Sequence, residues 1–483
     1  MSEKGISQSS LSSPTEVAID PQEEAKLRKK LDILLLPMVA VTYTFLFLDR
    51  SNIGNARAAG LEKDIGLHTF DFNIGTCLFY LIFILFEVPC ALLVKRFGFW
   101  LIPASVISFG IITMSTAFVH NRAGFYATRI ILGATESFAL PGISYLLTRY
   151  YRRNELTSRV GCFMLVAAGA SGAFGGLLAA GLLRLGRIGS RSSWQNIFLV
   201  EGIITTGFGI LSFPFFPTDP LNTKMLNEEE RQLAIARIYA DQPEIKDTKE
   251  AMNKKLLKRG VLNVTTLACS WLFIVGNCSV QGLGIFLPSI LQVNYPGASP
   301  VRIQILVVPI YITAGIIALA ATVGCIKTGK HFPFALFAGA CTITGYSIWI
   351  ATDSSAAKAR YAACFLNMTG GFATGPVVLG WAASNASPDT VRAMVGAVVT
   401  GIGSIGSIAG VWAYVQTDAH TGYHSGNAFN LSMSASLIVV ILGLLAYQRH
   451  ENKRRDSGHR DYRLEKGGVE LLGSLHPSFR YVH

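Results

Sequence analysis

The chain has 483 residues, of which 51% are hydrophobic and 15% are charged, whereas about 25% of the residues in a soluble protein are charged. This composition argues against a soluble enzyme, and it gives the excess of 42 Lys and Arg over 30 Asp and Glu residues a membrane explanation in place of a nucleic-acid partner. Long uncharged stretches alternate with short basic segments, which is typical of a chain whose main solvent is lipid.

The first 32 residues form a polar tail rich in Ser and Glu, with a basic run from Lys26 to Lys30 near its end. This tail lacks the apolar core and cleavage site of a signal peptide. We therefore expect the first hydrophobic segment to remain in the protein as a membrane anchor.

Twelve apolar stretches follow, each long enough to cross a hydrocarbon layer of about 30 Å. They lie at residues 33–57, 72–94, 100–119, 124–148, 160–183, 197–216, 262–291, 303–326, 332–352, 361–384, 393–416 and 429–448. This layout predicts an all-α membrane protein with twelve transmembrane helices in two six-helix bundles. The predicted units are a tail (1–32), a first bundle (33–217), a central loop (218–260), a second bundle (261–448) and a second tail (449–483).

Lys and Arg residues outside the spans are concentrated in the two tails and the central loop. The positive-inside rule therefore places both termini and this loop in the cytoplasm, where the positive charge faces anionic lipid. Within the loop, the segments E-E-E-R-Q (228–232) and K-K-L-L-K-R (254–259) predict a short amphipathic helix on the inner surface. The absence of a Gly-rich phosphate loop from the sequence argues against a nucleotide site.

All eight cysteines lie in apolar stretches, and no C-x-x-C pair is present among them. This pattern favours reduced packing residues over metal ligands or disulfides. We expect neither a metal nor a cofactor.

The two halves show weak internal symmetry. The fourth span reads E-S-F-A-L-P-G from residue 136 and the tenth reads G-G-F-A-T-G-P from residue 370, while the fifth and eleventh spans have glycine-rich segments at 169–176 and 401–410. Helix breaks and small-residue faces at equivalent positions are expected of a transporter whose halves rock around a central site. The alternative is that glycines are simply common in membrane helices.

Ionisable residues inside the first six spans are the strongest functional signal, because each costs about 2.5–3.5 kcal/mol in the hydrocarbon layer. Asp49 and Arg50 lie in the first span, and Arg129 and Glu136 lie in the fourth. At a rise of 1.5 Å per residue, the two arginines reach a similar depth. Glu136 follows Arg129 by nearly two helical turns and therefore shares its helix face.

Two guanidiniums that face one cavity would bind a carboxylate, because the planar fork of each matches two oxygens. Carboxylates beside them can take up a proton when unpaired and release it when an arginine approaches. The alternative is that the four residues form structural pairs that only lock helices together. Glu87 and Glu201 lie near span ends, where snorkelling or capping is the commoner explanation, and we leave both out of the predicted site.

Four motifs carry a resemblance to a known family: F-L-D-R-S-N-I-G-N-A (47–56), L-F-E-V-P (85–89), R-I-I-L-G-A-T-E-S-F-A-L-P-G (129–142) and Y-Y-R-R-N-E-L-T-S-R (150–159). With these motifs the chain resembles the fungal anion:cation symporters of the major facilitator superfamily, a branch that includes allantoate, nicotinate and pantothenate permeases. The resemblance implies twelve helices, alternating access and proton-coupled movement of small organic anions.

Carried over residue by residue, the resemblance implies that Arg50 and Arg129 hold the substrate anion and that Asp49 and Glu136 carry protons. It also implies an inner gate, composed of Arg152, Arg153, Glu155 and Arg159. Lys95, followed by Arg96, stands where many facilitators place the acidic residue of their gating motif, so we expect these two basic residues to give the gate a different construction.

Two departures from the family pattern remove polar groups from the expected cavity. Phe83 stands where relatives often have a tyrosine, and Gly403-Ser404 replaces a Gly-Asn pattern. We therefore expect a cargo that is more apolar than a small polar acid. Second-half side chains that could line the site, although each alone is more often a packing residue, are Asn277, Gln281, Tyr311, Asn367, Thr369 and Trp381.

The sequence therefore predicts a monomeric proton:organic-anion symporter in a fungal plasma membrane. Its partners would be a small organic anion, protons and the lipid bilayer. The alternatives are an exporter of a carboxylated secondary metabolite and a nutrient sensor that binds without transporting. A membrane enzyme is disfavoured, because the spans contain no nucleophile constellation or His/Cys cluster.

Overall fold

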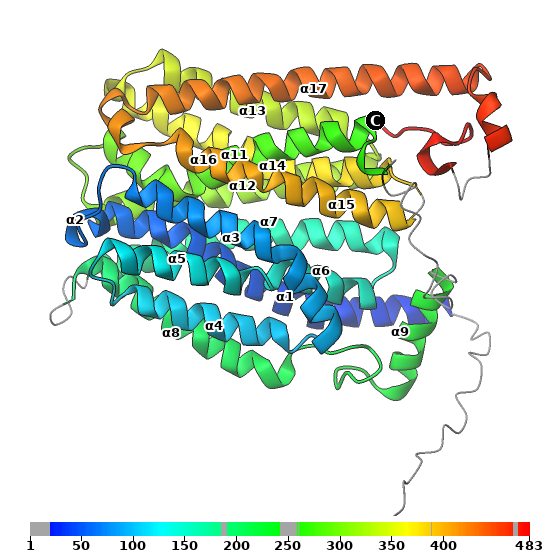
Figure 1. The fold of residues 1–483 in the computed structure, drawn as a ribbon, viewed down its shortest axis with the longest axis horizontal. Helices are drawn as coiled ribbons and strands as arrows, with labels where there is room; N and C mark the ends of the chain where they lie inside the picture. Colours follow the sequence, from blue (N-terminus) through cyan, green and yellow to red (C-terminus); the bar gives the residue numbers. More distant parts are fainter. Residues whose placement is uncertain (1–19, 185–190, 242–257, 259, 388, 467–471) are drawn as a thin grey trace, which may run out of the picture.

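The computed structural model describes residues 20–184, 191–241, 258, 260–387, 389–466 and 472–483. Within these residues, eleven helical segments are long and apolar enough to cross a membrane. A shorter apolar helix, α4 (Leu101–Thr116), is about 24 Å long and makes the twelfth. The helices run roughly side by side in Figure 1, with the first six below and the last six above. The predicted all-α fold of twelve helices is confirmed.

The first half consists of α1 (Pro21–Ala58), α3 (Asp71–Phe97), α4, the consecutive pair α5 (Arg122–Glu136) and α6 (Ala139–Tyr150), α7 (Arg153–Arg184) and α8 (Ser193–Ser212). The second half consists of α11 (Val264–Asn294), α12 (Pro300–Thr328), α13 (Phe332–Ala351), α14 (Ala357–Ser384), the pair α15 (Asp389–Gly403) and α16 (Ile405–Ala413), and α17 (His424–Asp456). Shorter elements between and after them are α2 (Leu61–Asp64), η1 (Phe213–Phe215), α9 (Glu228–Asp241), η3 (Ser354–Ala356), η4 (Gln416–Thr421), η5 (Asp461–Lys466) and η6 (Gly473–Leu475).

Helix α1 begins well before the first predicted span. The Asp20 side chain accepts a hydrogen bond from the Gln22 N–H at 3.0 Å, and Pro21 occupies the first turn. Both features favour the start of a helix. The polar first turns of α1 therefore extend beyond the apolar span, at the same end of the bundle as α9 and the C-terminal residues (Figure 1). We call this end the tail end and the opposite end, which carries α2, the α2 end.

The two helix breaks do not lie at equivalent positions of the two halves, so this part of the predicted symmetry is wrong. In the first half, α5 ends at Glu136 and α6 begins at Ala139, because Pro141 has no N–H to bond to the Ser137 carbonyl. In the second half the break separates α15 from α16, while α14 continues through Pro376.

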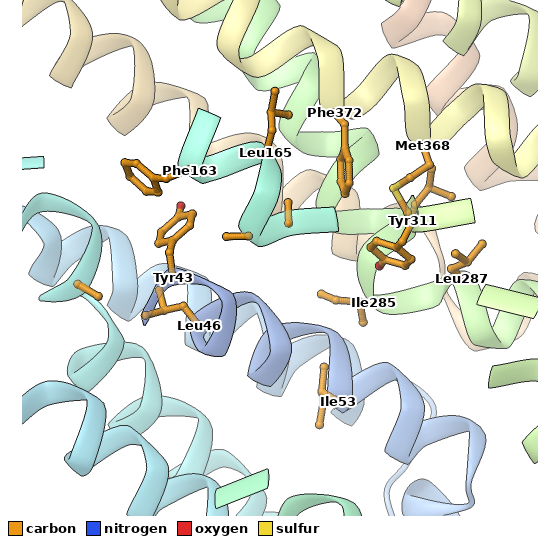
Figure 2. Packing of buried hydrophobic residues seen from close by; sticks show 14 of the residues in the cluster. Tyr43, Leu46, Ile53, Phe163, Leu165, Ile285, Leu287, Tyr311, Met368 and Phe372 are labelled. Atoms are coloured by element: carbon orange, nitrogen blue, oxygen red, sulfur yellow. The ribbon is translucent and has the colours of Figure 1, made fainter. Parts of the chain in front are cut away.

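Small residues bring the two halves together along α7 and α12. A Cβ atom added at Gly172 would lie 2.0 Å from the Tyr311 ring, and one added at Gly169 would lie 3.5 Å from the Cα atom of Gly315. Figure 2 shows the buried apolar side chains around this contact, which come from both halves. The glycine-rich segment of the fifth span therefore lies where close helix packing requires it.

Gly54 on α1 provides a second close approach, because a Cβ atom there would lie 1.8 Å from the Ile285 carbonyl oxygen on α11. We expect Gly54→Ala to destabilise this closed contact by about 1–3 kcal/mol, the usual cost of overpacking, and so to lower the melting temperature of the purified protein. Gly207→Ala is the matched control, since nothing lies within 4 Å of its added Cβ atom. Equal melting temperatures for the two variants would contradict this interpretation of the interface.

Candidate functional site

Arg50 on α1 lies at the centre of the predicted site. Its side chain is 8% exposed, and its Nε donates to Glu136 Oε2 at 2.9 Å. The guanidinium carbon lies 4.4 Å from the centre of the Phe83 ring, within the range of a cation–π interaction. The Phe47 and Phe79 rings also flank it, at 5.8 and 5.5 Å. Phe83 therefore forms an aromatic surface under the arginine, and its role in lining the cavity stays a prediction.

Arg129 on α5 is brought to the same cavity as Arg50. A small hollow is bordered by both arginines, by Glu136 and by Tyr80. Arg129 is 3% exposed, and its Nη2 lies 3.5 Å from the Thr116 hydroxyl. Its Nε atom is buried and has no hydrogen-bond partner. The donors of Arg129 are therefore only partly satisfied within the protein.

Asp49 and Glu136 place two buried carboxyl groups beside the arginines. Asp49 Oδ1 accepts a hydrogen bond from the Thr113 hydroxyl at 2.9 Å. The two carboxyl groups interact with each other, and Asp49 Oδ2 and Glu136 Oε1 have no hydrogen-bond partner. Since two ionised carboxylates can only accept, a hydrogen bond between them would require a proton on one of them.

Glu201 on α8 is a further member of this cluster, although it was not among the predicted site residues. It is 1% exposed, and both carboxyl oxygens are buried, so the expectation that it snorkels or caps at a helix end is wrong. Its near neighbours include Asp49, Asn52 and Arg129. The sequence spacing could have indicated that Glu201 packs inward. Residues three or four positions apart share a helix face, so Glu201 lies on the same face of α8 as Phe198 and the polar residues further along the helix. Glu87, by contrast, is only partly buried.

Three of the predicted lining residues of the second half lie at the cavities. A second hollow is bordered by Arg50, Gln281 and Tyr311, and a larger hollow, toward the tail end, is bordered by Asn277. Gln281 accepts a hydrogen bond from Tyr80 at 2.9 Å, which joins α3 to α11.

The other three have contacts elsewhere in the second half, and a role for them in lining the site stays a prediction. Asn367 packs against Gly345 of α13, and Trp381 donates its indole N–H to the Val482 carbonyl at the tail end. Thr369 is buried in α14 and borders none of the three hollows. A helix presents only part of its circumference to the cavity, and composition alone did not identify that part.

The predicted gating residues lie at the tail end. Arg152 contacts Glu24 at 2.8 Å, and Arg159 contacts Asp32 at 2.7 Å. Glu155 contacts Arg237 of α9 at 2.6 Å, and Arg237 is fully buried. These contacts bind α7 to α1 and α9 within the first half.

The remaining gating candidates are less connected. Lys95 and Arg96 are exposed at the end of α3, where Arg96 lies over the Phe97 ring, and the side chain of Arg153 lies outside the described residues. A role of these residues in gating stays a prediction.

The predicted central-loop helix corresponds in part to α9. Residues 228–232 begin this helix, while most of 254–259 lies outside the described residues. Lys30 on α1 contacts Glu230 on α9 at 2.6 Å. Partial burial works to raise the pKa of Glu230, but the hydrogen bonds from Lys30 and from the Asn227 N–H hold it below its usual value. Charge pairing therefore ties α9 to the first half.

Comparison with known proteins agrees with this architecture. The family model of the Major Facilitator Superfamily matches residues 39–411. The chain belongs to the major facilitator superfamily. This superfamily consists of membrane transporters, so the protein is a multi-pass transporter and not an enzyme.

Two related superfamily transporters align along most of their length. An MFS-type transporter, efuF, of Hormonema carpetanum is 31% identical over 96% of this chain and 93% of its own length. The high-affinity nicotinic acid transporter of Saccharomyces cerevisiae is 29% identical over 96% of this chain and 85% of its own length.

A solved structure supports the superfamily fold. The structure of a bacterial homologue of the human lysosomal transporter Spinster, described as inward-facing and occupied, aligns with a TM-score of 0.62 and 15% identity. The alignment covers 86% of this chain and 96% of that one. At this identity the likeness concerns the fold alone.

The contacts of Arg237 generate a prediction about this transporter. Arg237→Ala removes a fully buried guanidinium from Glu24 and Glu155, which keep the partly exposed Arg152 and Arg28 as partners. We therefore expect a loss of stability below the roughly 3–5 kcal/mol that removal of one partner from an isolated buried ion pair costs. We expect a lower melting temperature, measured on the purified protein. Arg231→Ala, on the same helix but paired with a largely exposed glutamate, is the control. If Arg237→Ala instead left stability unchanged and altered only the transport rate, these ion pairs would act in gating and would not serve to hold the helices together.

Proposed function

We propose that the protein is a secondary active transporter of small organic carboxylates, driven by proton symport with alternating access. The observation that carries the proposal is the placement of Arg50 and Arg129 at one buried cavity, where Glu136 occupies only part of their hydrogen-bonding capacity. Guanidinium groups with unused donors in a buried site are suited to an anionic guest.

In the proposed cycle, Glu136 and the substrate carboxylate compete for Arg50. When a proton binds Glu136, its ion pair with Arg50 is lost, and the substrate carboxylate takes the vacated donors. The proton and the anion then cross together as the two halves rock, and after release Glu136 again pairs with Arg50. Asp49 would share the proton with Glu136, because their carboxyl groups lie close together. Alternating access requires only a difference in affinity between the two states.

The distribution of charge outside the spans supports an orientation with both termini in the cytoplasm. The tail end would then face the cytoplasm, and the larger hollow, which Asn277 borders, would lie on the cytoplasmic side of Arg50. At the α2 end, Asn73 donates to the Val411 carbonyl at 2.7 Å and Arg57 donates to Gln416 at 2.7 Å. Both contacts join the two halves, as expected of an inward-facing state. We place this monomeric carrier in the plasma membrane.

The lining of the cavities supports a cargo with an apolar body. Phe47 and Phe372 border both larger hollows, and the one toward the tail end is otherwise lined mainly by apolar residues. Such a surface favours a carboxylate with an aromatic or aliphatic body, since the binding energy comes from apolar contact and one ion pair. A relative that is named for nicotinic acid transport is consistent with this class. An exporter would use the same geometry, and only the direction of accumulation distinguishes the two.

The assigned role of Arg129 can be tested by uptake of radiolabelled nicotinate, benzoate and succinate into yeast at acidic external pH. We expect Arg129→Ala to abolish uptake while the protein still reaches the membrane, because removal of one buried guanidinium leaves the anion without half of its receptor. Arg122→Ala is the matched control, since Arg122 lies on the same helix but is 55% exposed. Retained uptake by Arg129→Ala would contradict the proposed anion site.

A further inference from the structure

The carboxyl group of Glu201 is buried without a hydrogen bond to satisfy it. Glu201 is 1% exposed, and neither of its oxygens has a hydrogen-bond partner. An ionised carboxylate in such a place is costly, because burial of a charge without partners carries a desolvation penalty of several kcal/mol. A glutamate at this position therefore needs a role that a neutral residue does not provide.

The groups around Glu201 come from the neighbouring helices. Its charged neighbours are Asp49 on α1 and Arg129 and Glu136 on α5, and the Asn52 side chain of α1 is a possible hydrogen-bond donor to it. From α4, the Thr113 hydroxyl donates to Asp49 Oδ1, which leaves Asp49 Oδ2 as a further buried atom without a partner. Glu201 and Asp49 thus turn unsatisfied oxygens toward the same buried cluster.

A count of charges indicates that this cluster holds a proton. Three carboxyl groups lie here with the guanidiniums of Arg50 and Arg129. Fully ionised, the cluster would carry a net negative charge in a region where an unpaired charge is expensive. Since Arg50 pairs with Glu136 and Thr113 donates to Asp49, Glu201 is the carboxyl with the weakest support for its ionised form.

The positions of the three carboxyls along their helices place Glu201 and Asp49 at a similar depth. At 1.5 Å per residue, Glu201 lies about 12 Å from the start of α8 and Asp49 lies about 14 Å from the end of α1. Glu136 lies deeper, about 21 Å from the start of α5. These three helix termini are all at the α2 end (Figure 1). Glu201 and Asp49 therefore share a layer, and Glu136, which pairs with Arg50 and interacts with Asp49, connects this layer to the proposed substrate site.

We propose that Glu201 is the entry carboxyl of a proton relay that runs from the α2 end through Asp49 to Glu136. This relay deepens the proposed function and rests on it. A proton from external water binds one oxygen of Glu201 when the α2 end is open. It then passes to Asp49, which leaves Glu201 as a carboxylate, and from Asp49 to Glu136, which releases Arg50 for the substrate. Each transfer moves one proton between two oxygens and needs no further reactant.

Glu201→Gln tests the relay, because the amide keeps the size of the side chain but cannot take up or release a proton. The purified protein is reconstituted into lipid vesicles, and two quantities are measured with nicotinate as the substrate. The first is accumulation driven by a proton gradient, and the second is exchange of nicotinate across the membrane without a gradient. We expect Glu201→Gln to lose gradient-driven accumulation and its dependence on external pH while retaining exchange. Asp64→Asn is the matched control: Asp64 is exposed and accepts from the Trp194 indole on α8 at 2.8 Å, a contact that an asparagine oxygen preserves.

Each outcome separates the relay from the proposed function. Wild-type accumulation with an unchanged pH profile in Glu201→Gln would overturn the relay and leave proton symport intact. A sodium requirement that disappears in Glu201→Gln would also overturn it, because the carboxyl would then bind a cation other than the proton. Absence of proton-driven uptake by the unaltered protein for nicotinate, benzoate and succinate would overturn the proposed function, and the relay with it.

A second measurement needs no variant and decides the question if Glu201→Gln does not fold. Dicyclohexylcarbodiimide reacts with protonated carboxyl groups in apolar surroundings, and mass spectrometry locates the adduct. We expect labelling of Glu201 in the unaltered protein to increase as the pH falls. Labelling that is independent of pH, or its absence, would mean that Glu201 does not change protonation and would overturn the relay.

Discussion

The cost of an ionised group in hydrocarbon governs the arrangement of this protein. Such a group is retained only when it is paired, hydrogen-bonded or functional. In the first half, Arg50 and Arg129 have unused donors, and Asp49, Glu136 and Glu201 have unused acceptors. A cluster whose hydrogen-bonding capacity exceeds what the protein itself satisfies is suited to exchange protons and to bind an anion.

Arg360 in the second half shows the contrasting structural use of a buried cation. It is 2% exposed, yet its donors contact Asn294 and the carbonyl oxygens of Trp349, Thr352 and Gly422 at 2.7–3.1 Å. These partners fasten the start of α14 to neighbouring segments. Because neutral carbonyls surround Arg360, it is a packing element, whereas the arginines of the first half face carboxyl groups that can be displaced.

Much of the fold and part of the site could be predicted from the sequence, because hydropathy and charge act locally. The lengths of the apolar stretches predicted the twelve helices, and the cost of buried charge singled out Arg50 and Arg129. Glu201 was missed because distance from a span end does not reveal which face of α8 packs inward. The contacts of Arg152 with Glu24 and of Glu155 with Arg237 could not be predicted, since they depend on the polar extension of α1 and the docking of α9.

The central claim is that a substrate carboxylate replaces Glu136 at Arg50. The most direct measurement is the binding of nicotinate and of its uncharged amide, nicotinamide, to purified wild-type protein and to Glu136→Gln at acidic and alkaline pH. We expect nicotinate to bind the wild type more tightly at acidic pH, Glu136→Gln to bind nicotinate equally at both pH values, and nicotinamide to bind neither protein. Equal binding of the acid and the amide, or a Glu136→Gln variant that keeps the pH dependence of the wild type, would contradict this claim.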